Sequence, residues 1–356
     1  MIPGSTAVML DTAIHALAYA WGKPLATARI RQSPEDFQVT EIPLLEPDGA
    51  GEHVWLWIRK RGENTLYVAE QLSTLAGVHP RQVSFAGLKD RHAVTEQWFS
   101  VQLPGKDEPH WEDMNSDTVA ILRHARHSRK LRRGALKGNT FRITLRDISG
   151  DPEELEQRLG IIAREGVPNY FGEQRFGRDG SNLYTADRLF NNPKLRLSRN
   201  KRSLTLSAAR SFLFNQVLSA RITAGNWNVP LAGDAMQLDG SHSYFIAEVV
   251  DAGLSARVAS QDIHPTGPLH GRGENPAQGA CRELEAAVLA DHASWCAGLE
   301  TAGLKQDRRA LRLIATDLAW RWGTSGELIL TFSLPAGAYA TSVLREVVLF
   351  GAAVGG

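Results

Sequence analysis

The sequence predicts an α+β fold, because stretches with strand periodicity and stretches with helix periodicity follow one another in no regular order. Residues 53–59 place aliphatic side chains on one face and tryptophans on the other, while residues 140–146 and 327–334 alternate apolar and polar side chains. Residues 65–76 have a helical apolar stripe that ends before Gly77. This irregular mixture favours α+β architecture over a doubly wound parallel sheet.

The remaining elements are predicted from the same periodicities and from their end signals. Asp151 is a good helix cap, Pro152 suits the first helical position, and Gly166 suits the end of that helix. Further strands are expected at 37–42, 83–86 and 97–101, and further helices at 207–224, 281–304 (broken or paired) and 341–349. A charged loop, residues 87–92, therefore lies between two strands.

Composition is that of an ordinary globular protein, with 43% hydrophobic and 22% charged residues in a chain of 356, a length that suits two domains. The apolar stretch 7–21 is interrupted by Asp11 and His15, so neither a signal peptide nor a membrane span is expected and the cytoplasm is the predicted location. Cys281 and Cys296 form no metal-binding pair and are expected to be buried free thiols.

Positive charge is concentrated in two windows, although the formal net charge is only +1. Residues 118–146 hold nine Lys or Arg and no acid, and residues 188–233 hold eight and no acid, so the windows carry +17 and the remainder −16. Such segregation indicates an anion-binding surface, and nucleic acid is the partner that it predicts. The alternative is that each window is a solvated surface paired with acids elsewhere.

Several chemistries lack their sequence signals. No glycine-rich dinucleotide motif follows a strand, and no phosphate-binding P-loop, HExxH zinc motif or GxSxG nucleophile motif is present. The histidines form no spaced pair with a carboxylate nearby. The sequence therefore predicts neither a metal nor an organic cofactor.

The stretch SFAGLKDRHAVTEQ, residues 84–97, carries the most chemical information. It sets Asp90 between Lys89 and Arg91 on a loop that begins with glycine. Flanking cations favour the charged form of a carboxylate, which a nucleophile or base acting on a sugar requires, and they would also meet phosphate. Spacing alone equally fits a solvated charge cluster on a surface turn.

This stretch resembles the hallmark motif of the TruD pseudouridine synthases, and other segments resemble that family in the same order along the chain. They are SPEDF at 33–37, GNTF at 138–141, VPNYFGEQRFG at 167–177, FNQ at 214–216 and LPAG at 334–337. The resemblance implies a discontinuous catalytic domain, residues 1–165 and 314–356, with a mainly antiparallel sheet, and an inserted α/β domain at 166–313.

The resemblance also implies an activity and a set of site residues. The activity is the isomerisation of uridine to pseudouridine in tRNA, at position 13 of the D-arm. Apart from the resemblance, we expect a monomer without a cofactor. Asp90 matches the catalytic aspartate, and Phe37, Asn139 and Tyr339 match positions that contact the target nucleotide. The family more often has Phe at the last position. Lys89, Arg91 and Phe141 complete the expected substrate-binding set, although Phe141 shares the parity of core residues.

Three questions stay open at this stage. Asp90 either attacks C1′ to give a glycosyl ester, or removes the C2′ proton to give a glycal. A non-catalytic RNA-binding protein would also have the basic windows. A carboxylate such as Asp90 beside the RNA phosphates would not help such a protein to bind. A nucleoside hydrolase would explain a sugar-directed carboxylate, but such enzymes pair two carboxylates or use a metal.

Overall fold

The computed structural model describes residues 13–105, 107–192 and 194–350, so the first part of the apolar stretch 7–21, residues 7–12, lies outside the described residues. Within that range the chain forms two compact units. The sheet unit comprises Pro24–Arg164, Ala315–Ala340 and residues 347–350, and the helical unit comprises residues 13–23, Glu165–Ile314 and Thr341–Glu346. The assignment of these units to a catalytic domain and an insertion stays a prediction.

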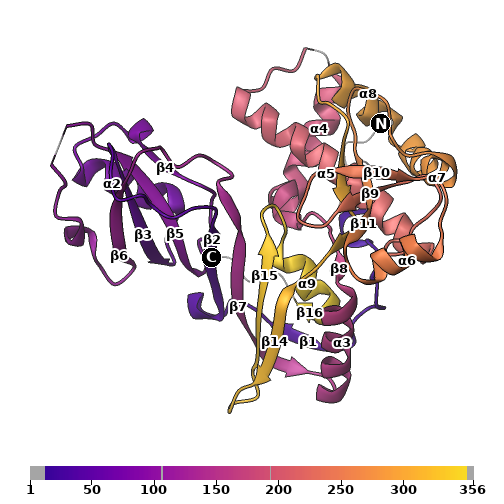
Figure 1. Cartoon of the computed structure of the whole chain (residues 1–356), viewed down its shortest axis with the longest axis horizontal. Coiled ribbons are helices and arrows are strands. Elements are labelled where there is room, and N and C mark those ends of the chain that lie inside the picture. Colours follow the sequence, from indigo (N-terminus) through magenta and orange to yellow (C-terminus); the bar gives the residue numbers. More distant parts are fainter. Residues whose placement is uncertain (1–12, 106, 193, 351–356) are drawn as a thin grey trace. The chain divides into compact units, whose positions relative to one another are not determined.

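The sheet unit is built on one large sheet with strand order β14-β15-β7-β2-β5-β3-β6 (Figure 1). β2 and β5 pair in parallel, and the other neighbours along this path are antiparallel. The strands span β2 Phe37–Pro43, β3 His53–Arg61, β5 Val94–Gln102, β6 Val119–His127, β7 Leu136–Ser149, β14 Thr316–Trp322 and β15 Leu328–Pro335. Short strands extend it: β1 Thr27–Arg29 on β7, β4 Val83–Phe85 on β5, and β16 Leu349–Phe350 on β1. The expected α+β class with a mainly antiparallel sheet is confirmed.

The two faces of β3 explain how its sequence folds. Val54, Leu56 and Ile58 are fully buried beneath α2, Thr65–Leu75, whose Val68 and Leu72 are fully buried in the same cluster. The opposite face places Trp55 and Trp57 against Trp98 of β5, in a second cluster. Strict alternation therefore sets both faces at once, since successive strand residues point to opposite sides.

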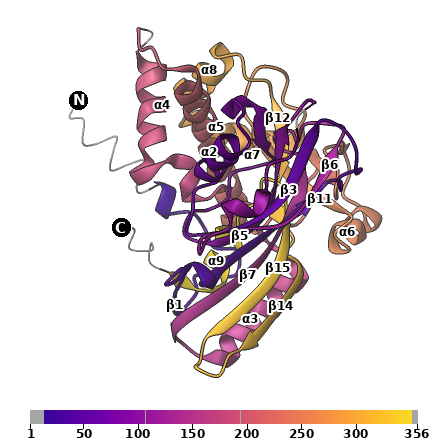
Figure 2. The ribbon, with the colours of Figure 1, turned by 90° about the vertical axis from the view of Figure 1, so that its left-hand side faces the viewer.

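The long strand β7 crosses the middle of the sheet and pairs on one side with β2 and on the other with β15. Helix α3, Pro152–Glu165, lies beside β14 and β15 (Figure 2) and buries Leu155, Leu159 and Ile162. Trp322 of β14 donates from Nε1 to Glu156 of α3 at 2.8 Å. Asp151 accepts from the backbone of Glu153 at 3.0 Å, which confirms the predicted helix start.

The helical unit packs helices around a four-stranded antiparallel sheet of order β10-β9-β11-β12. Its strands are β9 Asp234–Leu238, β10 Tyr244–Ala247, β11 Ile263–Leu269 and β12 Asp307–Ala310, with the separate pair β8 Val167–Pro168 and β13 Arg312–Leu313. Its helices are α4 Ser181–Asn191, α5 Arg199–Thr223, α6 Ala252–Ala259, α7 Gly279–Ala290, α8 Ala293–Thr301 and most of α9 Ala340–Val347.

Two helices differ from their predicted bounds. α5 begins at Arg199 rather than 207, because the Ser198 side chain caps it by accepting from Lys201 N at 3.3 Å. The predicted helix 281–304 is a pair, α7 and α8, separated at Asp291 and His292. Cys281 is buried and Cys296 half-buried, and both are free thiols.

Residues 13–350, apart from the undescribed 106 and 193, contain no helix that is both long and apolar enough to cross a bilayer.

Candidate active site

The loop between β4 and β5 carries Asp90, and side chains from α2 and β5 hold it in place. The Thr65 hydroxyl, at the start of α2, accepts a hydrogen bond from Lys89 N at 3.1 Å. Gln97 of β5 donates from Nε2 to Gly87 O at 2.9 Å. Thr65 and Gln97 are fully buried. Because buried and satisfied polar groups are costly to displace, these bonds fix the path of the loop.

Lys60 of β3 provides a third attachment directly at Asp90. Its Nζ donates to the backbone carbonyls of Asp90 and Glu63, both at 2.8 Å, and the whole residue is buried. Burial lowers the pKa of Lys60 to about 8, and the nearby Asp90 charge opposes that shift. The ammonium therefore anchors the main chain of Asp90 from the protein interior and leaves its carboxylate to face the other side.

The Asp90 carboxylate is partly exposed, and one of its oxygens is held. Arg31 Nη2 lies 2.9 Å from Asp90 Oδ2, with 23% of the Arg31 side chain and 27% of the Asp90 side chain exposed. Within the described residues, Oδ1 takes part in no hydrogen bond or ion pair. The open oxygen of such an aspartate is available to act as a nucleophile or a base.

Arg31 reaches Asp90 from an unusual backbone position. Its φ is 57°, in the left-handed region, which costs a non-glycine residue about 1 kcal/mol or more. Its guanidinium carbon lies 4.1 Å from the centroid of the Phe37 ring. Its Nε is buried and has no partner among the described residues. The side chain is therefore clamped between an aromatic ring and a carboxylate, with one donor still available.

A second polar group lies between β2 and β7. Lys89 Nζ is 3.1 Å from Glu41 Oε2 and donates to Asn139 Oδ1 at 2.7 Å. Only 5% of the Lys89 side chain and 1% of the Glu41 side chain are exposed. Burial raises the pKa of Glu41, and the Lys89 charge counteracts this. Asn139 is therefore oriented by a lysine that belongs to the Asp90 loop.

Aromatic side chains of β2, β7 and β15 lie farther along the same strands as this polar group. Phe37 meets Phe141 edge to face at 6.1 Å between ring centroids, and Phe141 stacks on Phe332 of β15 at 5.5 Å. Phe37 is 1% exposed and Phe141 7%. Both rings therefore belong to the packed core as the structure stands, and Phe37 is covered by Arg31.

The two remaining predicted residues lie at the edges of the site. Tyr339 is half-buried and follows the turn after β15, where Ala336 N bonds to Lys137 O at 3.1 Å, next to the strand end that carries Asn139. Arg91 is exposed and its Nε points to Gly62 O at 3.4 Å.

The sequence predicted Lys89 and Arg91 as the cations beside Asp90, and the structure differs. Within the described residues it is Arg31 that pairs with the carboxylate, while Lys89 turns to Glu41. Successive residues of an extended loop direct their side chains to different sides, so neighbours in sequence do not meet. Arg31, 59 residues before Asp90, could not be found from local spacing.

Two other site residues did have a sequence signal. Glu41 shares strand parity with the buried Phe37 and Val39, and Lys60 continues the buried face of Val54, Leu56 and Ile58. A charged residue at an apolar parity position indicates a buried and paired group. That signal identifies the residues but not their partners.

Many charges of the basic windows are already paired. In the sheet unit Arg123 pairs with Glu46 at 2.9 Å, Arg126 with Glu108 at 2.6 Å and Arg146 with Asp36 at 2.8 Å. In the helical unit Arg221 is fully buried and binds both oxygens of Asp234, at 2.8 and 2.9 Å, and Arg210 donates to two backbone carbonyls. The charge available to a ligand is therefore smaller than +17.

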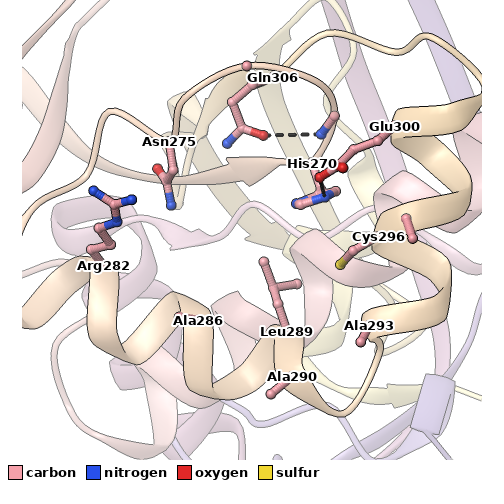
Figure 3. A pocket seen from close by; sticks show the side chains of 13 residues that line it. His270, Asn275, Arg282, Ala286, Leu289, Ala290, Ala293, Cys296, Glu300 and Gln306 are labelled. Atoms are coloured by element: carbon pink, nitrogen blue, oxygen red, sulfur yellow. Dashed lines mark hydrogen bonds and ion pairs between the residues drawn. The ribbon is translucent and has the colours of Figure 1, made fainter.

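A cavity of about 480 Å³ lies in the helical unit, between α7, α8 and the segment around residues 270–275 (Figure 3). Its floor is apolar, and its polar groups largely bond to the protein. His270 pairs with Glu300 at 3.0 Å, and Gln306 Oε1 accepts from Gly271 N at 3.1 Å. No cluster of metal-binding side chains was found among the described residues, in this cavity or elsewhere.

Comparison with known proteins matches the chain along nearly its whole length. A family profile described as tRNA pseudouridine synthase D (TruD) matches residues 13–189 and 181–347. The chain is 55% identical over 341 residues to a tRNA pseudouridine synthase D of Nitrosococcus oceani, covering 95% of each chain. It is 52% identical over 334 residues to that of Methylococcus capsulatus, covering 94% of each.

The fold is also that of a solved structure. A crystal structure of a TruD protein from Methanosarcina mazei superposes with a TM-score of 0.74, covering 95% of this chain and 97% of that one at 24% sequence identity. At this level of identity the match supports the fold.

Proposed function

The chain belongs to the tRNA pseudouridine synthase D (TruD) family, and from this premise we propose that Asp90 converts uridine to pseudouridine by acting on its ribose. Proteins of this family are isomerases that act on tRNA, and we place the target at position 13 of the D-arm. We further propose that the catalytic domain comprises residues 1–165 and 314–356, and that residues 166–313 are the insertion.

One observation carries the proposal for Asp90. Its main chain is anchored by the buried Lys60, its Oδ2 is held by Arg31 at 2.9 Å, and its Oδ1 is open on a side chain that is 27% exposed. A reacting group needs this combination of a fixed position and an unoccupied atom. The buried Arg221–Asp234 pair differs in this respect, because Arg221 binds both oxygens of its carboxylate.

The isomerisation breaks the N1–C1′ bond, turns the uracil, and forms a C5–C1′ bond. The proton on C5 leaves and N1 acquires one, so that the product has the composition of the substrate. The Asp90 carboxylate serves either as nucleophile at C1′ or as base toward the C2′ proton. In both routes Arg31 keeps the carboxylate oriented and balances its charge until the carboxylate reacts.

The uridine must leave its stack to reach Asp90, which costs a few kcal/mol. We propose that Tyr339 and Phe37 contact the extruded nucleotide, and base stacking on an aromatic ring contributes about 1–3 kcal/mol. Because Arg31 covers Phe37, contact with that ring requires Arg31 to move or to share the surface. Asn139, oriented by Lys89, would bond the uracil edge or a ribose hydroxyl, with Phe141 behind it and Arg91 near phosphate.

The test is the release of tritium from tRNA labelled at C5 of uridine, since the C5 proton must leave in the reaction. Asp90→Asn and Asp90→Ala should bind tRNA within a few-fold of the original protein and release no tritium. Asp147→Asn removes another carboxylate of the same unit, one that lies 3.6 Å from Arg29 with 61% of its side chain exposed, and should remain active. Appreciable release by either Asp90 variant would exclude this residue as the reacting group.

Free uridine as substrate separates the proposed activity from that of a nucleoside hydrolase. The proposal expects no turnover of the free nucleoside and no free uracil from tRNA. Mapping of pseudouridine in reacted tRNA then tests position 13. A product at another position would refute that assignment without contradicting the role of Asp90.

A further inference from the structure

The sheet unit has a concave site beside β4, the strand that leads into the Asp90 loop. This cavity, of about 330 Å³, is lined by β4 and by the segment that precedes β7. The lining residues are Val83, Ser84, Phe85, Lys130, Leu131, Arg132 and Arg133. Three of the seven are cations and none is an acid, so the cavity is suited to an anion.

The cations of this cavity differ from Arg123, Arg126 and Arg146 of the same basic window, which pair with carboxylates. Arg132 and Arg133 are exposed, and neither forms an ion pair with any carboxylate of the described residues. The Arg133 guanidinium carbon instead lies 5.3 Å from the centroid of the Phe85 ring. Lys130 Nζ uses one donor on Arg81 O at 2.7 Å. Their remaining N–H groups are therefore available to a ligand.

Ser84 supplies an independent indication of a ligand. Its Oγ is buried and has no hydrogen-bond partner among the described residues, although the residue lines the cavity. A buried hydroxyl without a partner costs about 1–3 kcal/mol. If the Ser84 side chain turned toward the cavity, a phosphate oxygen there would accept its hydrogen bond and remove this cost.

The basic segment is held in place before any ligand arrives. Leu131 is 2% exposed and packs in the tryptophan cluster of Trp55, Trp57 and Trp98. Trp55 Nε1 donates to Arg129 O at 3.0 Å, and Gly134 N donates to Ala86 O at 2.8 Å. A preorganised site loses less entropy when it binds. The last of these bonds also ties the segment to the residue before Gly87, where the Asp90 loop begins.

We propose that Ser84, Lys130, Arg132 and Arg133 bind one backbone phosphate of the RNA substrate close to the target uridine. Asp90 is five positions after Phe85, so their Cα atoms are at most about 18 Å apart. A phosphate held here sets the register of the RNA relative to Asp90. The inference rests on the proposed function for its ligand, and it adds the position at which that ligand is held.

The experiment compares Arg132→Gln/Arg133→Gln with Arg123→Gln. Arg123 lies in the same basic window but pairs with Glu46, so its variant controls for loss of positive charge. Binding of labelled tRNA is measured from low to moderate NaCl, and kcat and KM at one salt concentration. The double variant should raise Kd and KM at least tenfold and leave kcat within twofold. Its slope of log K against log salt should be smaller by about 0.7–0.9, since the one lost phosphate contact contributes about that much.

Ser84→Ala removes only the hydroxyl and should raise Kd a few-fold without changing the salt slope. The proposal is overturned if the double variant keeps the salt slope and the Kd of the original protein. It is also overturned if Arg123→Gln weakens tRNA binding as much as the double variant does. Failure of the proposed function has a different outcome, because the unaltered protein would then form no pseudouridine whatever its salt dependence.

Discussion

Lys60→Met offers the sharpest test of how the Asp90 loop is held. Methionine matches the length and apolar stem of lysine but removes the ammonium that donates to the carbonyls of Asp90 and Glu63 at 2.8 Å. Each carbonyl left buried without a donor costs about 1–3 kcal/mol. The substitution also removes the cost of holding a buried charge, so at pH 7 we expect the free energy of unfolding to change by less than about 2 kcal/mol.

The effect of Lys60→Met on the free energy of unfolding depends on pH, and its size follows from the pKa of Lys60. Burial lowers the pKa of Lys60 from 10.5 to about 8 in the folded protein, and each pKa unit corresponds to about 1.4 kcal/mol. At pH 7 both states carry the charge, and the folded state bears a cost of about 3 kcal/mol. Above pH 8 the folded state loses the proton while the unfolded chain keeps it, so the unfolded state binds more protons and stability rises with pH.

Urea unfolding of both proteins at several pH values measures this effect. The unfolding free energy of the original protein minus that of Lys60→Met should increase by about 2 kcal/mol between pH 7 and 9.5. Other titrating groups are shared and cancel in the difference. At pH 7 kcat should fall about 10- to 100-fold, because a displacement near 1 Å at a reacting group costs about that much. A difference that does not change with pH, together with an unchanged kcat, would refute the role given to Lys60.

Two further changes have calculable effects. Gly138→Ala would bring its Cβ into the backbone carbonyl of Leu334 on the adjacent strand. The free energy of unfolding should therefore fall by about 1–3 kcal/mol, which denaturant unfolding measures. The displacement of Asn139 should lower kcat, which tritium release measures. Arg308→Ala removes the partner of Glu285, a pair whose side chains are both 1% exposed, and should cost about 3–5 kcal/mol in chemical denaturation. Arg257→Ala removes the partner of Asp262 from a half-exposed pair and should lower the free energy of unfolding by at most about 1 kcal/mol. If Arg257→Ala and Arg308→Ala destabilised the protein equally, the argument from burial would be contradicted.

Local periodicity predicted the strands and helices whose apolar residues recur with a regular spacing. β3, β7 and β15 have the alternation of a strand, and α2 and α3 have a stripe and end signals. β3, β15, α2 and α3 were therefore found to within about two residues, whereas β7 was predicted only over its middle, 140–146, and extends from Leu136 to Ser149. Strands β9 to β12 were not predicted. They are short, and β11 is buried on almost every residue, so it has no alternation by which a strand is recognised. Helix α5 was predicted too short because its first turns are basic and exposed rather than amphipathic.

The sequence by itself determined the α+β class, the position of Asp90 on a loop between two strands, and a resemblance that the family match confirms. Only the tertiary structure decided which groups surround that carboxylate. Arg31 lies 59 residues from Asp90 and Lys60 lies 30 residues away, and they meet it because β-sheet pairing closes those separations. Strand register and a left-handed turn at Arg31 set these contacts, and neither is written in the local spacing of charged residues.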